Sequence, residues 1–293
     1  MESGEKRLCR YLPYGVQLMI ITVPDYYPEF KCIADRCTHT CCRGWEIDID
    51  DAAFSRFQEL DDVADKIQED EVNGTRYFHL NADESCPFLD ENGLCGLIRR
   101  YGPDMLCDIC RDHPRFRNYW TDRIEVGIGL VCEEAARLIL SKKKPVKYIV
   151  FADDAKPFST TEKETMPAIS GHKETLSISR LEQSAVLPED EKWLMDYRDA
   201  RLREIQTDGP QARILEYLIY RYLPDALYDG LVDARMRLIE RMYSEIIKKW
   251  ECTDGTFESL VETVRQYSYD VEYDEEVLAR MLHECEESFS PSL

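Results

Sequence analysis

The alternation of apolar and polar residues predicts short strands in the first half of the chain. Val16 to Val23 is an apolar run rich in β-branched side chains and is followed by a proline, which indicates a strand rather than a helix. Two more strands are expected at residues 77–80 and 147–151. Residues 115–129 are expected to form a hairpin, with its turn at residues 121–122.

Apolar residues spaced three and four positions apart predict helices elsewhere. Residues 50–71 carry such a stripe and begin with Asp50 and Asp51, either of which can cap a helix. Cys132 opens an amphipathic helix that continues through Leu140. In the second half of the chain, long helices are expected at about 189–206, 210–222, 225–250, 256–267 and 274–288.

A change in composition separates these elements into two parts. Residues 152–187 are rich in Ser, Thr, Pro, Lys and Glu and poor in aromatic residues, which is typical of a linker or a mobile loop. Residues 1–151 are expected to form a cysteine-rich, metal-binding α+β domain with short strands, and residues 188–293 an all-helical domain. The predicted fold class is therefore α+β, mainly α.

The charge of the chain limits the partners that we expect. The 37 basic and 58 acidic residues give a formal charge of −21, which disfavours nucleic acid and anionic membrane surfaces, because both require a basic face. No run approaches the ~20 apolar residues of a membrane span. Val16 to Val23 lacks the basic flank and cleavage site of a signal peptide. We therefore expect a cytoplasmic protein, in a reducing compartment where stable disulfides are rare. The oligomeric state is left open.

The cysteines are the clearest chemical signal in the chain. Ten of the twelve precede residue 133, and nine of these form the pattern C32-x4-C37-x3-C41-C42, C86-x8-C95, C107-x2-C110 and Cys132. Thiolates bind zinc and iron well, and short spacers let one loop supply two ligands. The pattern suits one 4Fe–4S cluster with spare thiols, or two separate sites, with structural zinc as the alternative. The expected ligands are Cys37, Cys41, Cys42, Cys86, Cys95, Cys107, Cys110 and Cys132.

The remaining cysteines are assigned differently. Cys32 is expected either to join the ligands or to pack in a core, and Cys9, Cys252 and Cys285 lie outside the clusters. Adjacent side chains on an extended backbone point in different directions, so only one of Cys41 and Cys42 is expected to bind a given metal.

Several segments of the chain resemble the flagellin lysine-N-methylase family, which is part of a wider group of cysteine-rich domains described as zinc or iron chelators. The longest is VPDYYPEFKCIADRCTHTCCRGWEIDID at residues 23–50. Similar segments follow in order: CPFLDENGLCGLI, YGPDMLCDICRDHPR, LVCEEAARLIL, LEYLIYRYL and QYSYDVEYDEEVLARML. The resemblance implies methyl transfer from S-adenosylmethionine to lysine side chains of flagellin or a similar protein, with an iron–sulfur cluster in the enzyme. The alternative is a non-catalytic, metal-chelating or redox-sensing module that binds a protein partner.

Four residues near the cysteines are candidates for cofactor binding. Arg111 and Arg115 can donate bidentate hydrogen bonds to a cofactor carboxylate, or can offset the negative charge of a cluster. Gly127 and Gly129 lie between an expected strand and an expected helix, as in a nucleotide-binding turn. The catalytic residues are left unassigned. His113 is expected to be a hydrogen-bonded structural histidine, with metal ligation or proton transfer as the alternatives.

Overall fold

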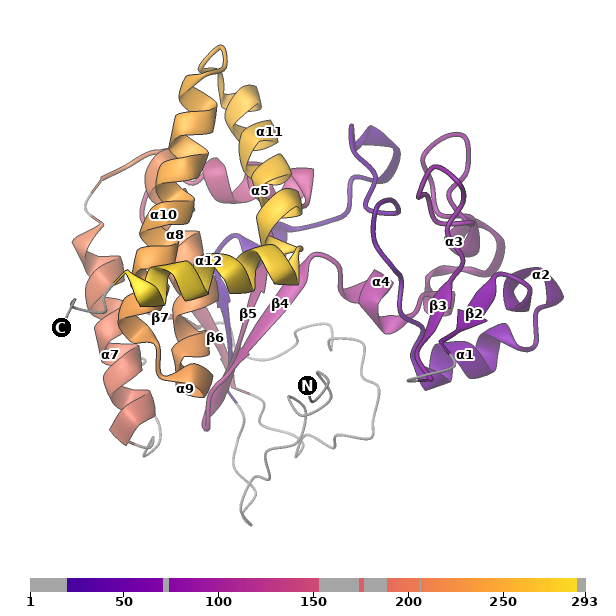
Figure 1. Cartoon of the computed structure of the whole chain (residues 1–293), viewed down its shortest axis with the longest axis horizontal. Helices are drawn as coiled ribbons and strands as arrows, with labels where there is room; N and C mark the ends of the chain where they lie inside the picture. Colours follow the sequence, from indigo (N-terminus) through magenta and orange to yellow (C-terminus); the bar gives the residue numbers. More distant parts are fainter. Residues whose placement is uncertain (1–19, 71–73, 153–173, 177–188, 206, 289–293) are drawn as a thin grey trace.

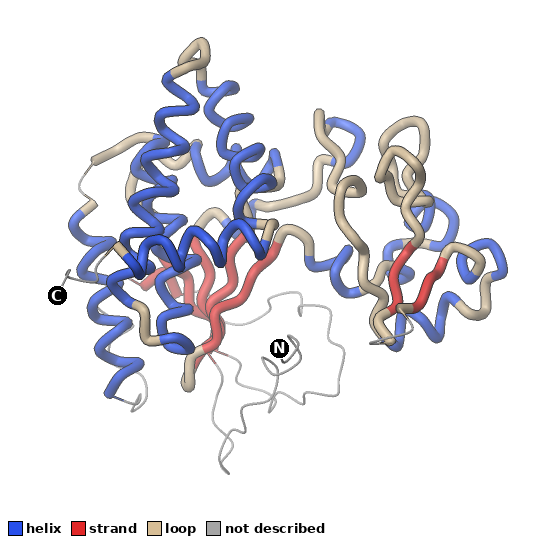
Figure 2. Tube along the Cα trace, viewed as in Figure 1, coloured by secondary structure: helices blue, strands red, loops and turns tan. Residues whose placement is uncertain are grey.

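The fold is mixed α+β and mainly helical, which confirms the predicted fold class. The computed structural model describes residues 20–70, 74–152, 174–176, 189–205 and 207–288 (Figure 1). Two parts are visible, and loops make up much more of one of them than of the other (Figure 2). We call residues 31–112 the cysteine lobe, and the larger part, which contains the main sheet and the long helices, the sheet body.

The sheet body is built on a five-stranded sheet with the order β4-β5-β1-β6-β7. β1 runs parallel to β5, and the other neighbours are antiparallel. The whole cysteine lobe lies in the connection between β1 and β4. The strands are β1 (Ile20–Pro24), β4 (Arg115–Tyr119), β5 (Arg123–Ile128), β6 (Tyr148–Ala152) and β7 (Glu174–Leu176).

Helices from the second half of the chain pack against this sheet (Figure 1). One hydrophobic core joins strand residues such as Ile128 with helix residues such as Leu238. Its members therefore come from both sides of the expected linker, and the boundaries at residues 151 and 188 stay a prediction. The helices are α5 (Glu133–Leu140), α7 (Glu189–Glu204), α8 (Pro210–Tyr222), α9 (Ala226–Asp229), α10 (Val232–Glu251), α11 (Phe257–Tyr267) and α12 (Glu275–Glu287).

The cysteine lobe has a small core of its own, around Phe57, Phe78 and Phe88. A two-stranded hairpin and four short helices surround this core. With so few backbone pairs, the lobe depends largely on the packing of its side chains. Its elements are α1 (Asp51–Phe57), α2 (Asp61–Ala64), β2 (Ile67–Glu69), β3 (Arg76–Phe78), α3 (Gly96–Tyr101) and α4 (Asp108–Asp112).

Most predicted elements are confirmed, and one is wrong. The expected strands, the 115–129 hairpin and the helix after Cys132 are present, and the expected long helices are present with a break at Gly230. The single helix predicted at 50–71 is instead α1, α2 and β2. Asp50 caps α1 as expected, by accepting from the Ala53 amide at 2.9 Å. The apolar residues of this segment do not continue as one helix, because Ile67 pairs with Phe78 in the β2–β3 hairpin.

Two further predictions concern the linker and the membrane. The expected linker at 152–187 lies outside the described residues, apart from its first residue and β7. Within the described ranges, none of the helices has both the length and the apolar character that crossing a membrane requires.

Candidate functional site

The eleven cysteines in the described part of the chain are all free thiols, and Cys9 lies outside it. Five of them share the small core of the cysteine lobe. Cys86 and Cys107 are buried there, at 5% and 1% exposure, and the other three pack against that core while partly exposed. We call these five the lobe group: Cys42, Cys86, Cys95, Cys107 and Cys110.

Backbone hydrogen bonds bring distant members of the lobe group together. The Cys86 amide donates to the Cys42 carbonyl at 2.8 Å, so the first and second cysteine motifs lie side by side. Leu89 and Cys95 form an isolated β-bridge, and the Gly96 amide donates to the Phe88 carbonyl at 2.6 Å. These contacts turn the C-x8-C motif back on itself, so that both of its thiols face one core.

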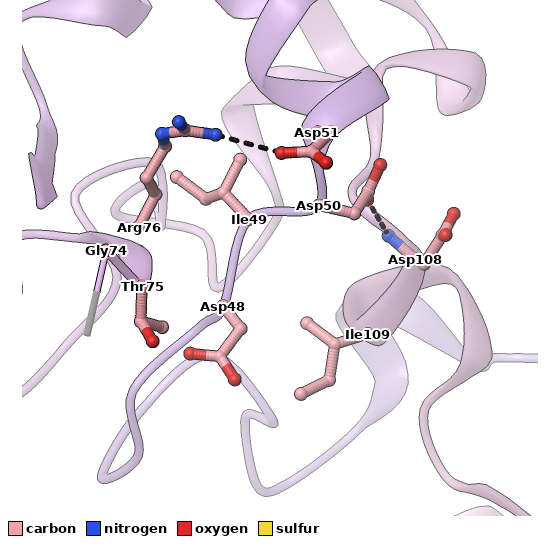
Figure 3. Close-up of a pocket in the computed structure, with 9 residues that line it drawn as sticks. All are labelled: Asp48, Ile49, Asp50, Asp51, Gly74, Thr75, Arg76, Asp108 and Ile109. Atoms are coloured by element: carbon pink, nitrogen blue, oxygen red, sulfur yellow. Dashed lines mark hydrogen bonds and ion pairs between the residues drawn. The ribbon is translucent and has the colours of Figure 1, made fainter. Parts of the chain in front are cut away.

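An acidic pocket of about 340 Å³ is lined by Asp108 and Ile109, the two residues between Cys107 and Cys110 in the sequence (Figure 3). Asp50 lines this pocket, caps α1, and also accepts from the Asp108 amide at 2.8 Å. This one carboxylate therefore holds the start of α1 against the start of α4, where Cys107 is the N-cap residue. Asp51 forms an ion pair with Arg76 at 3.0 Å across the pocket. The pocket acids thus fix the position of the C-x2-C motif.

Other cysteines lie where the cysteine lobe meets α5 of the sheet body, a contact that we call the seam. The Glu133 carboxylate accepts from the Thr38 amide at 2.8 Å and from the Thr38 hydroxyl at 2.6 Å. The Cys37 thiol lies 3.6 Å from the same carboxylate oxygen. Because Cys132 directly precedes Glu133, these contacts bring Cys37 next to Cys132, although they are far apart in the sequence.

Cys41 and Cys42 join the two sets of thiols. Their thiols share a hydrogen bond, which raises the pKa of Cys41 and lowers that of Cys42 to about 7. Burial and the charges of Cys32 and Cys132 raise the Cys41 pKa further. Cys41 thus faces the thiols at the seam, while Cys42 packs against the lobe core.

Burial controls the titration of most of the other thiols. It raises the pKa of Cys37 to about 11 and that of Cys86 to about 12, and it also raises the pKa of Cys132. Cys107 is an exception, because a hydrogen bond with the Cys110 thiol lowers its pKa. Most of these thiols therefore hold their protons at neutral pH, and metal binding would have to release them.

The donor chemistry of these residues fits a soft metal. Thiol sulfur is the preferred ligand of zinc and of iron–sulfur clusters, and the eight expected ligands all belong to the two connected sets. Among the described residues, no three Cys, His, Asp or Glu side chains already converge to hold one metal ion.

An aromatic stack lies at the seam. The Trp45 indole packs against the His113 imidazole with centroids 6.0 Å apart, and His113 lies 6.2 Å from the Tyr273 ring. The Trp45 Nε1–H donates to the Cys41 carbonyl at 2.7 Å. Burial and the charge of Arg115 lower the pKa of His113 to about 4, so its imidazole is neutral at pH 7. Its buried Nε2 has no hydrogen-bond partner among the residues that the structure describes.

Next to this stack, Arg221 is enclosed by aromatic rings and a carboxylate. Its guanidinium lies 4.8 Å from the Phe116 ring centroid, pairs with Glu272 at 3.2 Å and donates to the Tyr217 hydroxyl at 2.7 Å. Glu272 closes a π-helical turn, Ser268–Glu272, that continues α11. π-Helical turns are frequent at functional sites.

The two candidate glycines lie under this group. A Cβ atom on Gly129 would come within 2.9 Å of Arg221 Nη1 and 3.2 Å of the Tyr273 hydroxyl. A Cβ on Gly127 would come within 2.2 Å of the Phe116 ring. The close packing of neighbouring side chains thus explains why glycine occupies both positions. The role of these glycines in cofactor binding stays a prediction.

The two candidate arginines already have protein partners. Arg111 pairs with Asp108 at 2.7 Å and donates to the Leu106 carbonyl at 2.7 Å. Arg115 donates to the Tyr27 hydroxyl at 2.9 Å. A cofactor carboxylate would have to displace or share these partners.

Sequence reasoning missed Glu133, Arg221 and Glu272. Glu133 carried a weak signal, because an acidic residue in the first turn of a helix is ordinarily explained by the helix dipole. Arg221 and Glu272 are 51 positions apart, and neither belongs to a cysteine motif. Only the packing of α8 against the π-helical turn brings them together.

Comparisons with known proteins give one consistent result. The chain is 26% identical over 130 residues to a Lysine-N-methylase of Salmonella choleraesuis (strain SC-B67), and 25% identical over 130 residues to one of Salmonella typhimurium. It is also 25% identical over 130 residues to the flagellar biosynthetic protein FliU of Salmonella muenchen. These matches confirm the resemblance to lysine-N-methylases that the cysteine motifs indicate.

The extent of these matches is limited. Each covers 41% of this chain, 32% of either Lysine-N-methylase and 77% of FliU. The matched stretch therefore spans about a third of the length of the two methylases. No family model and no solved structure matches the chain.

Proposed function

We propose, from the similarity to the Salmonella Lysine-N-methylases, that this protein methylates lysine side chains of flagellin or a similar protein in the cytoplasm. S-adenosylmethionine is the proposed methyl donor, and an iron–sulfur cluster held by the clustered cysteines the proposed resident cofactor. The observation that carries the proposal is the sequence similarity of this chain to two proteins named Lysine-N-methylase and to the flagellar biosynthetic protein FliU. The gathering of cysteines from four separate motifs into two connected sets supports it.

The proposed ligands are the eight cysteines expected from the sequence. A bound iron–sulfur cluster would supply either a rigid cross-link between loops or a binding point for the amino-acid end of the methyl donor. Arg111 and Arg115 are proposed to offset the charge of the thiolates and of the donor carboxylate. The two residues are neighbours, because the Arg115 guanidinium donates to the Arg111 carbonyl at 3.4 Å.

The seam is the proposed place for the substrate amine. A lysine ammonium is attracted by the faces of aromatic rings, and Trp45, His113 and Tyr273 supply three neighbouring rings there. Methyl transfer requires the neutral amine, which burial between the lobe and the body would favour. The imidazole of His113, neutral and with Nε2 unpartnered, is proposed to orient that amine.

A direct assay tests this proposal. The anaerobically purified protein is incubated with S-adenosylmethionine and flagellin from the same organism, and the flagellin is weighed by mass spectrometry. We expect mass gains in methyl increments that map to lysine peptides. A folded, metal-containing protein that leaves flagellin unmodified would contradict the proposal.

A non-catalytic chelating or redox-sensing module is the second candidate. The observation in its favour is that the matched stretch covers only 32% of either Lysine-N-methylase. Such a module would bind its protein partner and its metal as well as the proposed enzyme does. It would not bind S-adenosylmethionine. Titration of the protein with S-adenosylmethionine by calorimetry separates the two candidates.

A further inference from the structure

The clustered thiols are more numerous than one centre requires. A structural zinc ion takes four ligands, and a 4Fe–4S cluster takes four cysteines. Nine cysteines lie between Cys32 and Cys132, and five of them form the lobe group. The other four, which we call the seam group, are Cys32, Cys37, Cys41 and Cys132. Cys32 belongs with them because its charge acts on both Cys41 and Cys132.

The lobe group is complete within the cysteine lobe. All five side chains pack in or against the core that contains Phe57 and Phe78. The backbone contacts that position them, such as Cys86 to Cys42 at 2.8 Å, also stay inside residues 31–112. No residue of the sheet body is needed to gather these thiols.

The seam group depends on both parts of the molecule. Cys132 precedes α5 and packs against the core of the sheet body, whereas the other three cysteines belong to the lobe. Glu133 holds Cys37 in place, through the two hydrogen bonds from Thr38 and the 3.6 Å contact with the thiol. Three more lobe–body contacts close the same seam: His39 to Glu262 at 2.7 Å, Tyr269 to Gly44 at 3.3 Å, and Trp45 against His113.

The adjacent residues Cys41 and Cys42 mark the boundary between the groups. Cys42 packs against the lobe core with Cys86 and Cys107, and Cys41 does not belong to that core. The Cys41 carbonyl is held by Trp45, whose ring lies in the seam. The two thiols share a hydrogen bond, and the charges of Cys32 and Cys132 act on Cys41, so the two groups meet at this dipeptide.

We infer that the chain builds two separate thiol sites for soft metals: a lobe site made by Cys107, Cys110 and two of the other three lobe-group cysteines, and a seam site made by Cys32, Cys37, Cys41 and Cys132. The lobe site stabilises the fold of the lobe. The seam site is complete only when the lobe is docked on α5, and Glu133 is its positioning residue. This inference rests on the thiol metal centre of the proposed function, and it divides that centre in two.

The test counts metals in the full-length protein. Iron, zinc and acid-labile sulfide per chain are measured after anaerobic purification, together with the absorption spectrum. The variants are Cys110→Ser in the lobe group, Cys132→Ser in the seam group, the double variant, and the exposed Cys252→Ser as a control. We expect each single variant to lose one centre and retain the other, the double variant to lose both, and Cys252→Ser to lose neither.

A single shared site would give a different pattern. If Cys110→Ser and Cys132→Ser each remove all of the metal, or if Cys132→Ser removes none, the division into two sites is wrong. Wild-type protein with one centre per chain, or with no metal, would also overturn it. The ratio of iron and labile sulfide to zinc identifies which soft metal occupies each site.

Glu133→Gln tests the seam without removing a thiol. We expect it to lower occupancy of the seam site at least twofold while leaving the lobe site unchanged, and we expect Glu134→Gln to change neither. If the metal occupancy of the seam site is equal in Glu133→Gln and in wild type, Glu133 does not position that site. Metal counts are independent of methyl transfer, so protein with two centres that fails to methylate flagellin would overturn only the proposed function.

Discussion

Thr38 donates two hydrogen bonds to Glu133, from its backbone amide at 2.8 Å and from its hydroxyl at 2.6 Å. These bonds cross from the cysteine lobe to the first turn of α5. The Glu133 side chain is only 8% exposed, and its other carboxylate oxygen accepts from Arg137 at 3.2 Å. One buried carboxylate thus contributes two hydrogen bonds to the contact between the lobe and the sheet body.

The charge of Glu133 should make the stability of the protein depend on pH. Burial raises the Glu133 pKa, but the hydrogen bonds from Thr38 and Arg137 outweigh it, and the net pKa is lowered. A carboxyl group with a lowered folded-state pKa contributes stability that is complete above its unfolded pKa and is lost as the pH falls through the folded value. We expect Glu133→Gln to lower the free energy of unfolding at pH 7 by about 1–3 kcal/mol.

The measurement is denaturant unfolding at pH 7 and at acid pH. The difference between wild type and Glu133→Gln should shrink below the ordinary glutamate range, about pH 4. Glu134→Gln is the matched control, because Glu134 lies in the same helical turn and its ion pair with Arg137 is long, at 4.0 Å. A difference that stays constant with pH would show that the charge of Glu133 does not stabilise the fold.

The contact between Gly44 and Tyr269 should tolerate no side chain. Gly44 has a φ of +83°, and a Cβ there would lie 2.0 Å from the Tyr269 hydroxyl oxygen. Gly93 has a φ of +73° and nothing within 4 Å of the added carbon. Backbone strain destabilises both alanine variants by about 1 kcal/mol. Any additional loss of stability in Gly44→Ala therefore measures the contact between the lobe and the body.

Thermal unfolding of the two variants checks this prediction. We expect Gly44→Ala to melt several degrees below Gly93→Ala, and we expect Tyr269→Ala in the Gly44→Ala background to recover part of the difference. Equal melting temperatures for Gly44→Ala and Gly93→Ala would mean that the lobe does not press on Tyr269 in solution.

Arg221 should be far more important to stability than an exposed arginine. Glu272, its partner at 3.2 Å, has a fully buried side chain that also accepts from the Tyr217 and Tyr222 hydroxyls. Arg221→Met would leave that carboxylate buried without its cation, at a cost of about 3–5 kcal/mol. Arg241→Met removes an exposed pair with Glu284 and should cost at most about 1 kcal/mol. If Arg221→Met and Arg241→Met lower the free energy of unfolding in urea by similar amounts, the buried pair does not have this role.

His113 should destabilise the protein in mild acid. Burial and the Arg115 charge lower its pKa to about 4, whereas an unfolded histidine titrates near 6.5. The unfolded state therefore binds more protons between these values, so stability is complete above about pH 6.5 and falls as the pH is lowered toward 4. His113→Gln should flatten the profile of melting temperature against pH over this interval. An unchanged slope in the variant would mean that His113 is not held neutral.

Local patterns in the sequence predict most of the elements but not their assembly. The 115–129 hairpin, the helix after Cys132 and the cap at Asp50 follow from spacing and from side-chain chemistry that act over a few residues. The parallel pairing of β1 with β5 does not, because about a hundred residues separate Ile20 from its partner Arg123. The helix predicted at 50–71 is wrong for the same reason, since a cross-strand partner outweighs local periodicity there.

The thiols of the candidate site were predicted, and the groups that position them were not. Cysteine spacing points directly to metal ligands, because few other residue patterns have that meaning in a reducing compartment. Glu133, Arg221 and Glu272 are ordinary charged residues of amphipathic helices in the sequence. Their importance arises only from burial and from partners on other elements, which no local pattern records.

The transfer of a labelled methyl group from S-adenosylmethionine to flagellin tests the central claim most directly. The metal-containing protein is incubated with flagellin from the same organism and, in parallel, with the same flagellin after acetylation of its lysines. We predict that label enters lysine peptides of the untreated flagellin, that acetylation abolishes the transfer, and that Cys252→Ser transfers at the wild-type rate. Label absent from both flagellins, with a folded and metal-containing protein, would contradict the account.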